Sequence, residues 1–212
     1  MTDILTMANG SRCREAIIVL DCCHSGAFGT LPAIASSHAH LREGLSVLCA
    51  CRDSQSAAEI DGRGVFTGLV VEALYGGASD LLGRTTIADV FAFVDRHLGP
   101  WQQRPLFKCH VSQLSSLRQA NPRIHLSVLR QLPSIFPTPD TIYPLDPSYE
   151  SDTDDHSTSK AEAYNAIRLY RAVGLVGPTT ESHVYFAAML NGACRLTQLG
   201  QYYWHLCIER RI

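Results

Sequence analysis

The run Ala16-Ile17-Ile18-Val19-Leu20, with the hexapeptide Asp21-Cys22-Cys23-His24-Ser25-Gly26 directly after it, constrains the fold more than any other stretch. The run is apolar and β-branched on both faces, which predicts a fully buried parallel strand. In open α/β sheets, chemistry gathers where the strands end at their carboxyl edge. We therefore expect a thiol, a carboxylate and a Ser-Gly turn to lie together at one edge of a sheet.

The following hundred residues alternate between strand-like and helix-like patterns. Leu45 to Cys51 predicts a second buried strand, and Gly64-Val65-Phe66-Thr67-Gly68 leads into a helix that continues to Leu74. Thr86 followed by Asp89 predicts a capping box at the start of another helix, which Gly99-Pro100 ends. A third strand is expected over Gln103 to Phe107, with Pro105 favouring an edge position.

This combination of motifs resembles the caspase-like cysteine peptidases, in the D-x-C-H-S-G form of metacaspases and their bacterial relatives. The likeness covers about residues 1–115 and includes the nucleophile strand, the polar loop 53–59, the Gly-x-Phe-Thr helix and the Gln-x-Pro strand. It implies that Cys23 is the nucleophile, a role that a thiolate performs. His24, Ser25 and Gly26 are implied as supporting residues of the motif.

The resemblance also implies a substrate class. Asp21 and Cys23 are two residues apart and share one face of an extended chain, and in the metacaspase-like branch this aspartate lines the pocket for the residue before the cut. A carboxylate there favours Arg or Lys, and Asp53 and Gln55 are candidates for the same pocket. We expect a cysteine endopeptidase that acts on a protein or peptide and uses no cofactor or metal, since no D-x-D-x-D-G loop occurs.

The general base is the missing part of this prediction. The family takes it from a Gly-His-Gly upstream of the cysteine, and the 22 residues that precede Cys23 contain no such motif. His24 adjoins the nucleophile and leaves the chain in another direction, whereas His38 and His40 lie in the loop 26–43. We therefore expect the sequence to come from a truncated gene model, or otherwise from a split or degenerate gene, that lacks the segment with this histidine. The alternative is an inactive pseudo-peptidase that acts as an interaction module; in the enzyme, Arg42 is a candidate autoprocessing site.

The C-terminal third predicts a linker and a second module. Prolines and an acidic run indicate a linker over 119–160. Beyond it we expect a helix over 163–173, a hairpin of strands 183–188 and 193–196 around Asn191-Gly192, and a last helix capped by Thr197. This order is similar to a winged helix. It suggests a docking site for a protein partner, with DNA binding the weaker alternative because the basic residues form no tight cluster.

The expected architecture is therefore α/β. A partial caspase-like sandwich with a parallel-sheet core spans 1–118, the linker 119–160, and a small winged-helix-like α+β module 161–212. Net charge is −2, which gives no global attraction to nucleic acid or an anionic membrane. The eight cysteines contain no C-x-x-C pair, so a reduced, cytoplasmic protein is the natural interpretation. No apolar run reaches the roughly 18–20 residues of a membrane span.

Overall fold

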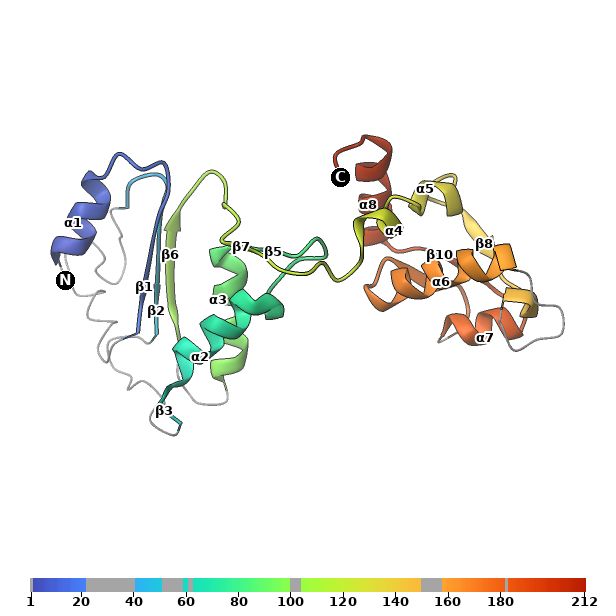
Figure 1. Ribbon diagram of the computed structural model, residues 1–212, viewed down its shortest axis with the longest axis horizontal. Helices are drawn as coiled ribbons and strands as arrows, with labels where there is room; N and C mark the ends of the chain where they lie inside the picture. The colour runs from blue at the N-terminus through green and yellow to red at the C-terminus, as the bar shows by residue number, and fades with distance from the viewer. Residues whose placement is uncertain are drawn as a thin grey trace. The chain divides into compact units, whose positions relative to one another are not determined.

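The chain is mixed α/β and divides into two compact units, residues 1–121 and residues 122–212. The computed structural model describes residues 2–21, 41–50, 59–60, 63–99, 104–149, 158–181 and 183–212 (Figure 1). The division corrects the predicted linker, because residues 122–149 belong to the second unit and contribute helices and a strand to it. Among the described helices, none combines the length and apolar character that crossing a bilayer would require.

The first unit is built on a sheet with helices on both faces (Figure 1). In its described part the strand order is β1 (Ala16–Leu20), β2 (Leu45–Cys49) and β6 (Leu106–His110). β1 and β2 run parallel, as predicted, whereas β6 runs antiparallel to β2. The predicted parallel core is thus a mixed sheet. β2 is buried throughout, whereas β1 lies at the edge of the described sheet and its Val19 is 44% exposed. The prediction that residues 16–20 form a fully buried strand is therefore wrong.

Alternating residues of β2 serve two separate cores. Leu45, Val47 and Cys49 pack with Leu5 of α1 (Thr2–Gly10) on one face. Leu48 and Ala50 face the other way, toward α2 (Val65–Glu72), which continues into the π-turn η2 (Ala73–Gly77), and α3 (Ile87–Leu98). This is the side-chain period of two that a strand covered on both faces requires.

Short elements complete the first unit. β3 (Glu59–Ile60) pairs antiparallel with β4 (Arg63–Gly64), which leads directly into α2, and β5 (Arg84–Thr85) pairs with β7 (Arg118–Gln119). The predicted capping box is confirmed: the Thr86 side chain accepts the Asp89 N–H, and the Asp89 carboxylate accepts the Thr86 N–H at 2.8 Å. α3 therefore starts where the sequence places it.

The second unit surrounds a sheet of order β8-β10-β9, formed by β8 (Ile142–Pro144), β10 (Ala193–Leu196) and β9 (Val176–Pro178), both pairings antiparallel. Its helices are α4 (Leu126–Leu129), α5 (Leu132–Ile135), the 3-10 helix η4 (Pro147–Tyr149), α6 (Thr158–Ala172), α7 (Val184–Met189) and α8 (Gln198–Ile208). Thr197 caps α8 as predicted, since its side chain accepts the Gly200 N–H at 3.1 Å.

The predicted hairpin around Asn191-Gly192 is wrong. Residues 184–189 form α7, and their buried positions Val184, Ala187 and Ala188 follow helical spacing. Asn191 has φ 52° and closes the end of that helix, a left-handed conformation that asparagine tolerates in helix ends as well as in hairpin turns. β10 instead pairs with β8, a strand from within the predicted linker.

Candidate functional site

Of the predicted site residues, the structure describes Asp21. Cys23, His24, Ser25 and Gly26 lie outside the described residues, as do Asp53 and Gln55. Asp21 follows the last residue of β1 directly. Ala50, the first residue after β2, donates its N–H to the Leu20 carbonyl oxygen at 2.9 Å, so the ends of the two parallel strands stay joined at this edge. The prediction that Asp21 stands at a carboxyl edge is confirmed for the described strands.

The Asp21 carboxylate lies at the start of α2. The Thr67 hydroxyl donates to Asp21 Oδ2 at 2.5 Å. A Cβ built on Gly64 would lie 2.7 Å from the same oxygen, so the carboxylate occupies the space that any larger residue at 64 would need. Asp21 is exposed to solvent, and its Oδ1 has no hydrogen-bond partner among the described residues. One carboxylate oxygen is thus held in place by the first turn of α2.

The Gly-Val-Phe-Thr sequence explains this arrangement locally. Gly64 is the N-cap of α2 and has no side chain to cap it, and the first turn contains no acidic residue. Negative charge near a helix N-terminus is favourable, and Asp21 supplies it from β1. Phe66 is buried in the core under α2 and anchors the turn, while Thr67, at the third helical position, directs its hydroxyl to Asp21. Sequence reasoning recognised the motif but missed the role of Thr67.

Of the described histidines of the first unit, His110 lies far from Asp21. His110 pairs with Leu45 at the amino end of β2, whereas Asp21 follows Leu20, which pairs with Cys49 at the opposite end. Four residues of strand, about 13 Å, separate the two ends. His110 Nδ1 lies 2.9 Å from the Leu41 carbonyl oxygen, and His97 Nδ1 lies 2.7 Å from that of Phe93. Both rings are thereby held in structural contacts.

The described cysteines divide into buried and exposed thiols. Cys49 is fully buried in the core between the sheet and α1. Burial raises the pKa of the Cys194 thiol to about 12 and also raises the pKa of Cys207, which disfavours the thiolate form at both. Cys13 and Cys109 are exposed. Three or more possible metal ligands do not gather anywhere in the described ranges.

Arg42, the candidate autoprocessing site, is tied to α1. Its guanidinium Nε donates to the Ala8 carbonyl oxygen at 2.8 Å, and its backbone N–H donates to Asn9 Oδ1 at 3.0 Å. A protease must bind the residue before the cut in an extended, accessible form. Cleavage after Arg42 would require these contacts to open first.

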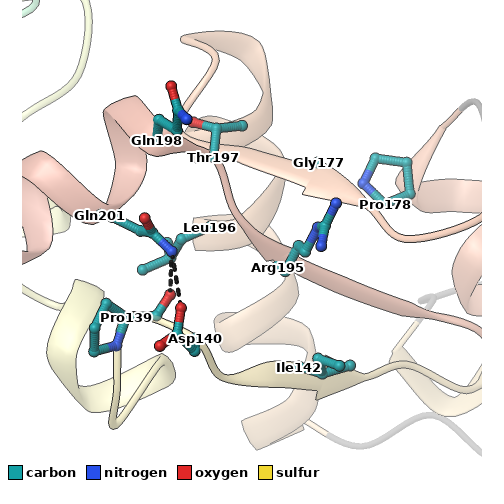
Figure 2. A pocket seen from close by; sticks show the side chains of 10 residues that line it. All are labelled: Pro139, Asp140, Ile142, Gly177, Pro178, Arg195, Leu196, Thr197, Gln198 and Gln201. Carbon is teal, nitrogen blue, oxygen red and sulfur yellow. Dashed lines mark hydrogen bonds between the residues drawn. The ribbon is translucent and has the colours of Figure 1, made fainter.

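The second unit contains a hollow of about 580 Å³ between β10, the start of α8 and the segment before β8 (Figure 2). Gln201 donates from Nε2 to the Pro139 carbonyl oxygen at 3.1 Å and to Asp140 Oδ1 at 3.2 Å, which ties α8 to that segment. Arg195 extends from β10 beside them. The hollow holds a cation and a carboxylate but no Cys or His, so it offers no nucleophile and base pair.

No protein-family model matches the chain, and no curated protein and no solved structure matches it either.

Proposed function

We propose that this protein is a cysteine endopeptidase of the caspase-like kind, with Cys23 as the nucleophile and a preference for cleavage after Arg or Lys. One observation carries the proposal. Asp21 from the first motif meets Gly64 and Thr67 from the second at the carboxyl edge of a parallel strand pair. Two sequence motifs that lie more than forty residues apart therefore build one small site. If each motif resembled the family only by chance, there would be no reason for the two to meet.

The proposed chemistry proceeds by acyl transfer. The Cys23 thiolate attacks the carbonyl carbon of the scissile bond, and the oxyanion that forms is held by backbone N–H groups of the turn around the cysteine. The general base, which has taken the proton of the Cys23 thiol, passes that proton to the leaving amine, and it then activates the water that hydrolyses the thioester. In the caspase-like family the base is a histidine of a Gly-His-Gly, a motif that the residues printed before Cys23 do not contain.

The substrate preference follows from Asp21. Because Thr67 holds Oδ2 of this exposed carboxylate, Asp21 is fixed in a position from which it is proposed to accept a charge-assisted hydrogen bond from a guanidinium or ammonium group. Asp53 and Gln55 are proposed to line the same pocket, on the strength of their position in the loop after β2. An aspartate side chain in the substrate would instead be repelled.

Affinity labelling tests nucleophile and preference without needing the base. A peptidyl-arginine chloromethyl ketone forms a C–S bond with the thiolate and releases chloride, and at about pH 8.5 an ordinary thiol is half ionised. We expect the arginyl reagent to label Cys23 about tenfold faster, or more, than its aspartyl counterpart. Peptide mapping by mass spectrometry locates the adduct, and the exposed Cys13 and Cys109 report alkylation without recognition.

Two variants complete this experiment. Cys23→Ala removes the adduct, and Asp21→Asn keeps the size of the side chain but abolishes the arginyl preference. Equal labelling of Cys23, Cys13 and Cys109 by both reagents, or faster labelling by the aspartyl reagent, would overturn the proposal.

A second candidate function is that of a pseudo-peptidase whose second unit docks a protein. It is favoured by the position of His110, which lies at the end of β2 opposite to the edge that bears Asp21. The docking role predicted for the second unit belongs to this candidate, although the hairpin on which the winged-helix likeness rested is replaced there by α7 and the β8–β10 pairing. Selective, Asp21-dependent labelling of Cys23 without turnover of arginyl peptides by the same preparation would favour it over the active enzyme.

A further inference from the structure

Two arginines of α6 line one hollow on the second unit. Arg168 and Arg171 are three residues apart, which places them on the same side of the helix. The hollow has a volume of about 370 Å³ and is completed by Ala172, His183 and Val184. We call it the basic hollow. It is separate from the polar hollow beside Arg195, with which it shares no lining residue.

The positive charge of the basic hollow is uncompensated within the described chain. No described carboxylate forms an ion pair with Arg168 or Arg171, whereas Lys160 on the same helix pairs with Asp146 at 2.8 Å. The Nε of Arg171 is buried and has no hydrogen-bond partner among the described atoms. Like charges three residues apart on a helix repel, and a buried donor without a partner is costly. A bound anion would relieve the repulsion between the two guanidinium groups.

His183 adds a third donor. Its Nδ1 accepts the Tyr185 N–H at 3.1 Å and so caps α7. An imidazole that accepts at Nδ1 carries its proton on Nε2 in the neutral form. The lining of the basic hollow therefore contains two guanidinium groups and an imidazole, and its described lining residues include no acidic side chain.

We propose that the basic hollow binds a phosphate monoester. Two guanidinium groups match the charge of the dianion, and their planar arrays of donors suit its terminal oxygens better than a point charge would. A second hollow of about 450 Å³ shares Arg168 and is lined by Asn165 and Leu169. Leu169 is 48% exposed, so this second hollow gives the organic part of the ester an apolar contact and an amide. The ligand class is thus a phosphorylated side chain of a peptide.

The test measures binding to the full chain by calorimetry, with inorganic phosphate, a phosphoserine peptide and the same peptide without phosphate as probes. We expect phosphate and the phosphopeptide to bind and the unphosphorylated peptide not to bind. Arg171→Gln and Arg168→Gln each weaken binding by about tenfold or more, the size of one charge-assisted hydrogen bond. Arg171→Lys keeps the positive charge and the packing of the aliphatic stem, so it should lose less affinity for phosphate than Arg171→Gln.

Arg210→Gln is the matched control, because Arg210 is exposed and lies outside the basic hollow. The Arg210→Gln variant should bind the phosphopeptide as tightly as the unaltered chain does. Circular dichroism checks that each variant is folded. Absence of saturable binding, or equal weakening by Arg171→Gln and Arg210→Gln, would overturn the proposal. So would duplex DNA binding more tightly than the phosphopeptide with a steep salt dependence, which would assign the arginines to a nucleic acid. None of these outcomes depends on peptidase activity.

Discussion

Asp21, Gly64 and Thr67 depend on one another, although the sequence separates them. Thr67 supplies the hydroxyl that holds one carboxylate oxygen, and Gly64 leaves the space in which that oxygen lies. The Gly-x-Phe-Thr motif can be recognised in the sequence. The contact between its threonine and the residue after β1 cannot be predicted from the sequence, because it depends on how α2 approaches the sheet.

The glycines of α2 provide a pair of matched substitutions. Gly64→Ala places a Cβ 2.7 Å from Asp21 Oδ2, so the carboxylate must move and the hydrogen bond to Thr67 is lost. Alanine is also a poorer N-cap than glycine, and we expect a destabilisation of about 1 kcal/mol. Gly68→Ala meets no atom within 4 Å and should instead stabilise the helix by about 0.5–1 kcal/mol. Urea unfolding measures both.

The opposite signs make this comparison decisive. Equal changes in the free energy of unfolding for the two variants would show that helix propensity alone governs the stability of α2 and that Asp21 is not held there. Under the proposed function, Gly64→Ala should also reduce the arginyl preference of labelling at Cys23, while Gly68→Ala leaves it intact.

Among the elements, local signals were predicted well and pairings were not. The capping box of α3 and the Thr197 cap of α8 are formed within a few residues of chain, and both stand where the sequence placed them. The 183–188 segment is rich in Val, Tyr and Phe, which favoured a strand, yet its buried residues recur at helical spacing. The partner of β10 was missed because β8 is a three-residue strand among prolines.

The capping box of α3 predicts the cost of its removal. Thr86→Ala takes away the oxygen that accepts the Asp89 N–H and breaks the 2.7 Å contact of the hydroxyl with the Asp89 carboxylate. We expect the free energy of unfolding to fall by about 1 kcal/mol, measured by urea unfolding. Thr86→Ser retains the hydroxyl and should lose much less; a serine variant as unstable as the alanine variant would contradict this role.

At the scale of the whole molecule, composition misplaced the boundary of the second unit. Prolines at 122, 133, 137, 139, 144 and 147 indicated a linker, but several of them flank or begin short elements, a position that proline tolerates. Leu129, Leu132 and Phe136 are fully buried. In a sequence, a proline-rich linker and short helices between prolines look alike, because the residues that bury the helices are distant in the chain.

The corrected boundary predicts which fragment folds. Residues 122–149 contact the rest of the second unit through side chains of α6 and α8: the Tyr170 hydroxyl donates to the Val128 carbonyl oxygen, and Trp204 Nε1 donates to that of Phe136, each at 2.6 Å. A fragment of residues 122–212 keeps these bonds and the β8–β10 pairing. We expect it to unfold cooperatively in urea and to give dispersed amide resonances.

The fragment 161–212, which the sequence favoured as a module, should not fold. Without α4, the hydroxyl of Tyr170, which is fully buried, loses its acceptor. Without β8, one side of β10 has no strand to pair with, and the sheet of the described unit is reduced to two short strands. A two-stranded ribbon is marginal alone in water. Dispersed resonances from 161–212 would therefore show that residues 122–160 of the unit are dispensable and would restore the predicted boundary.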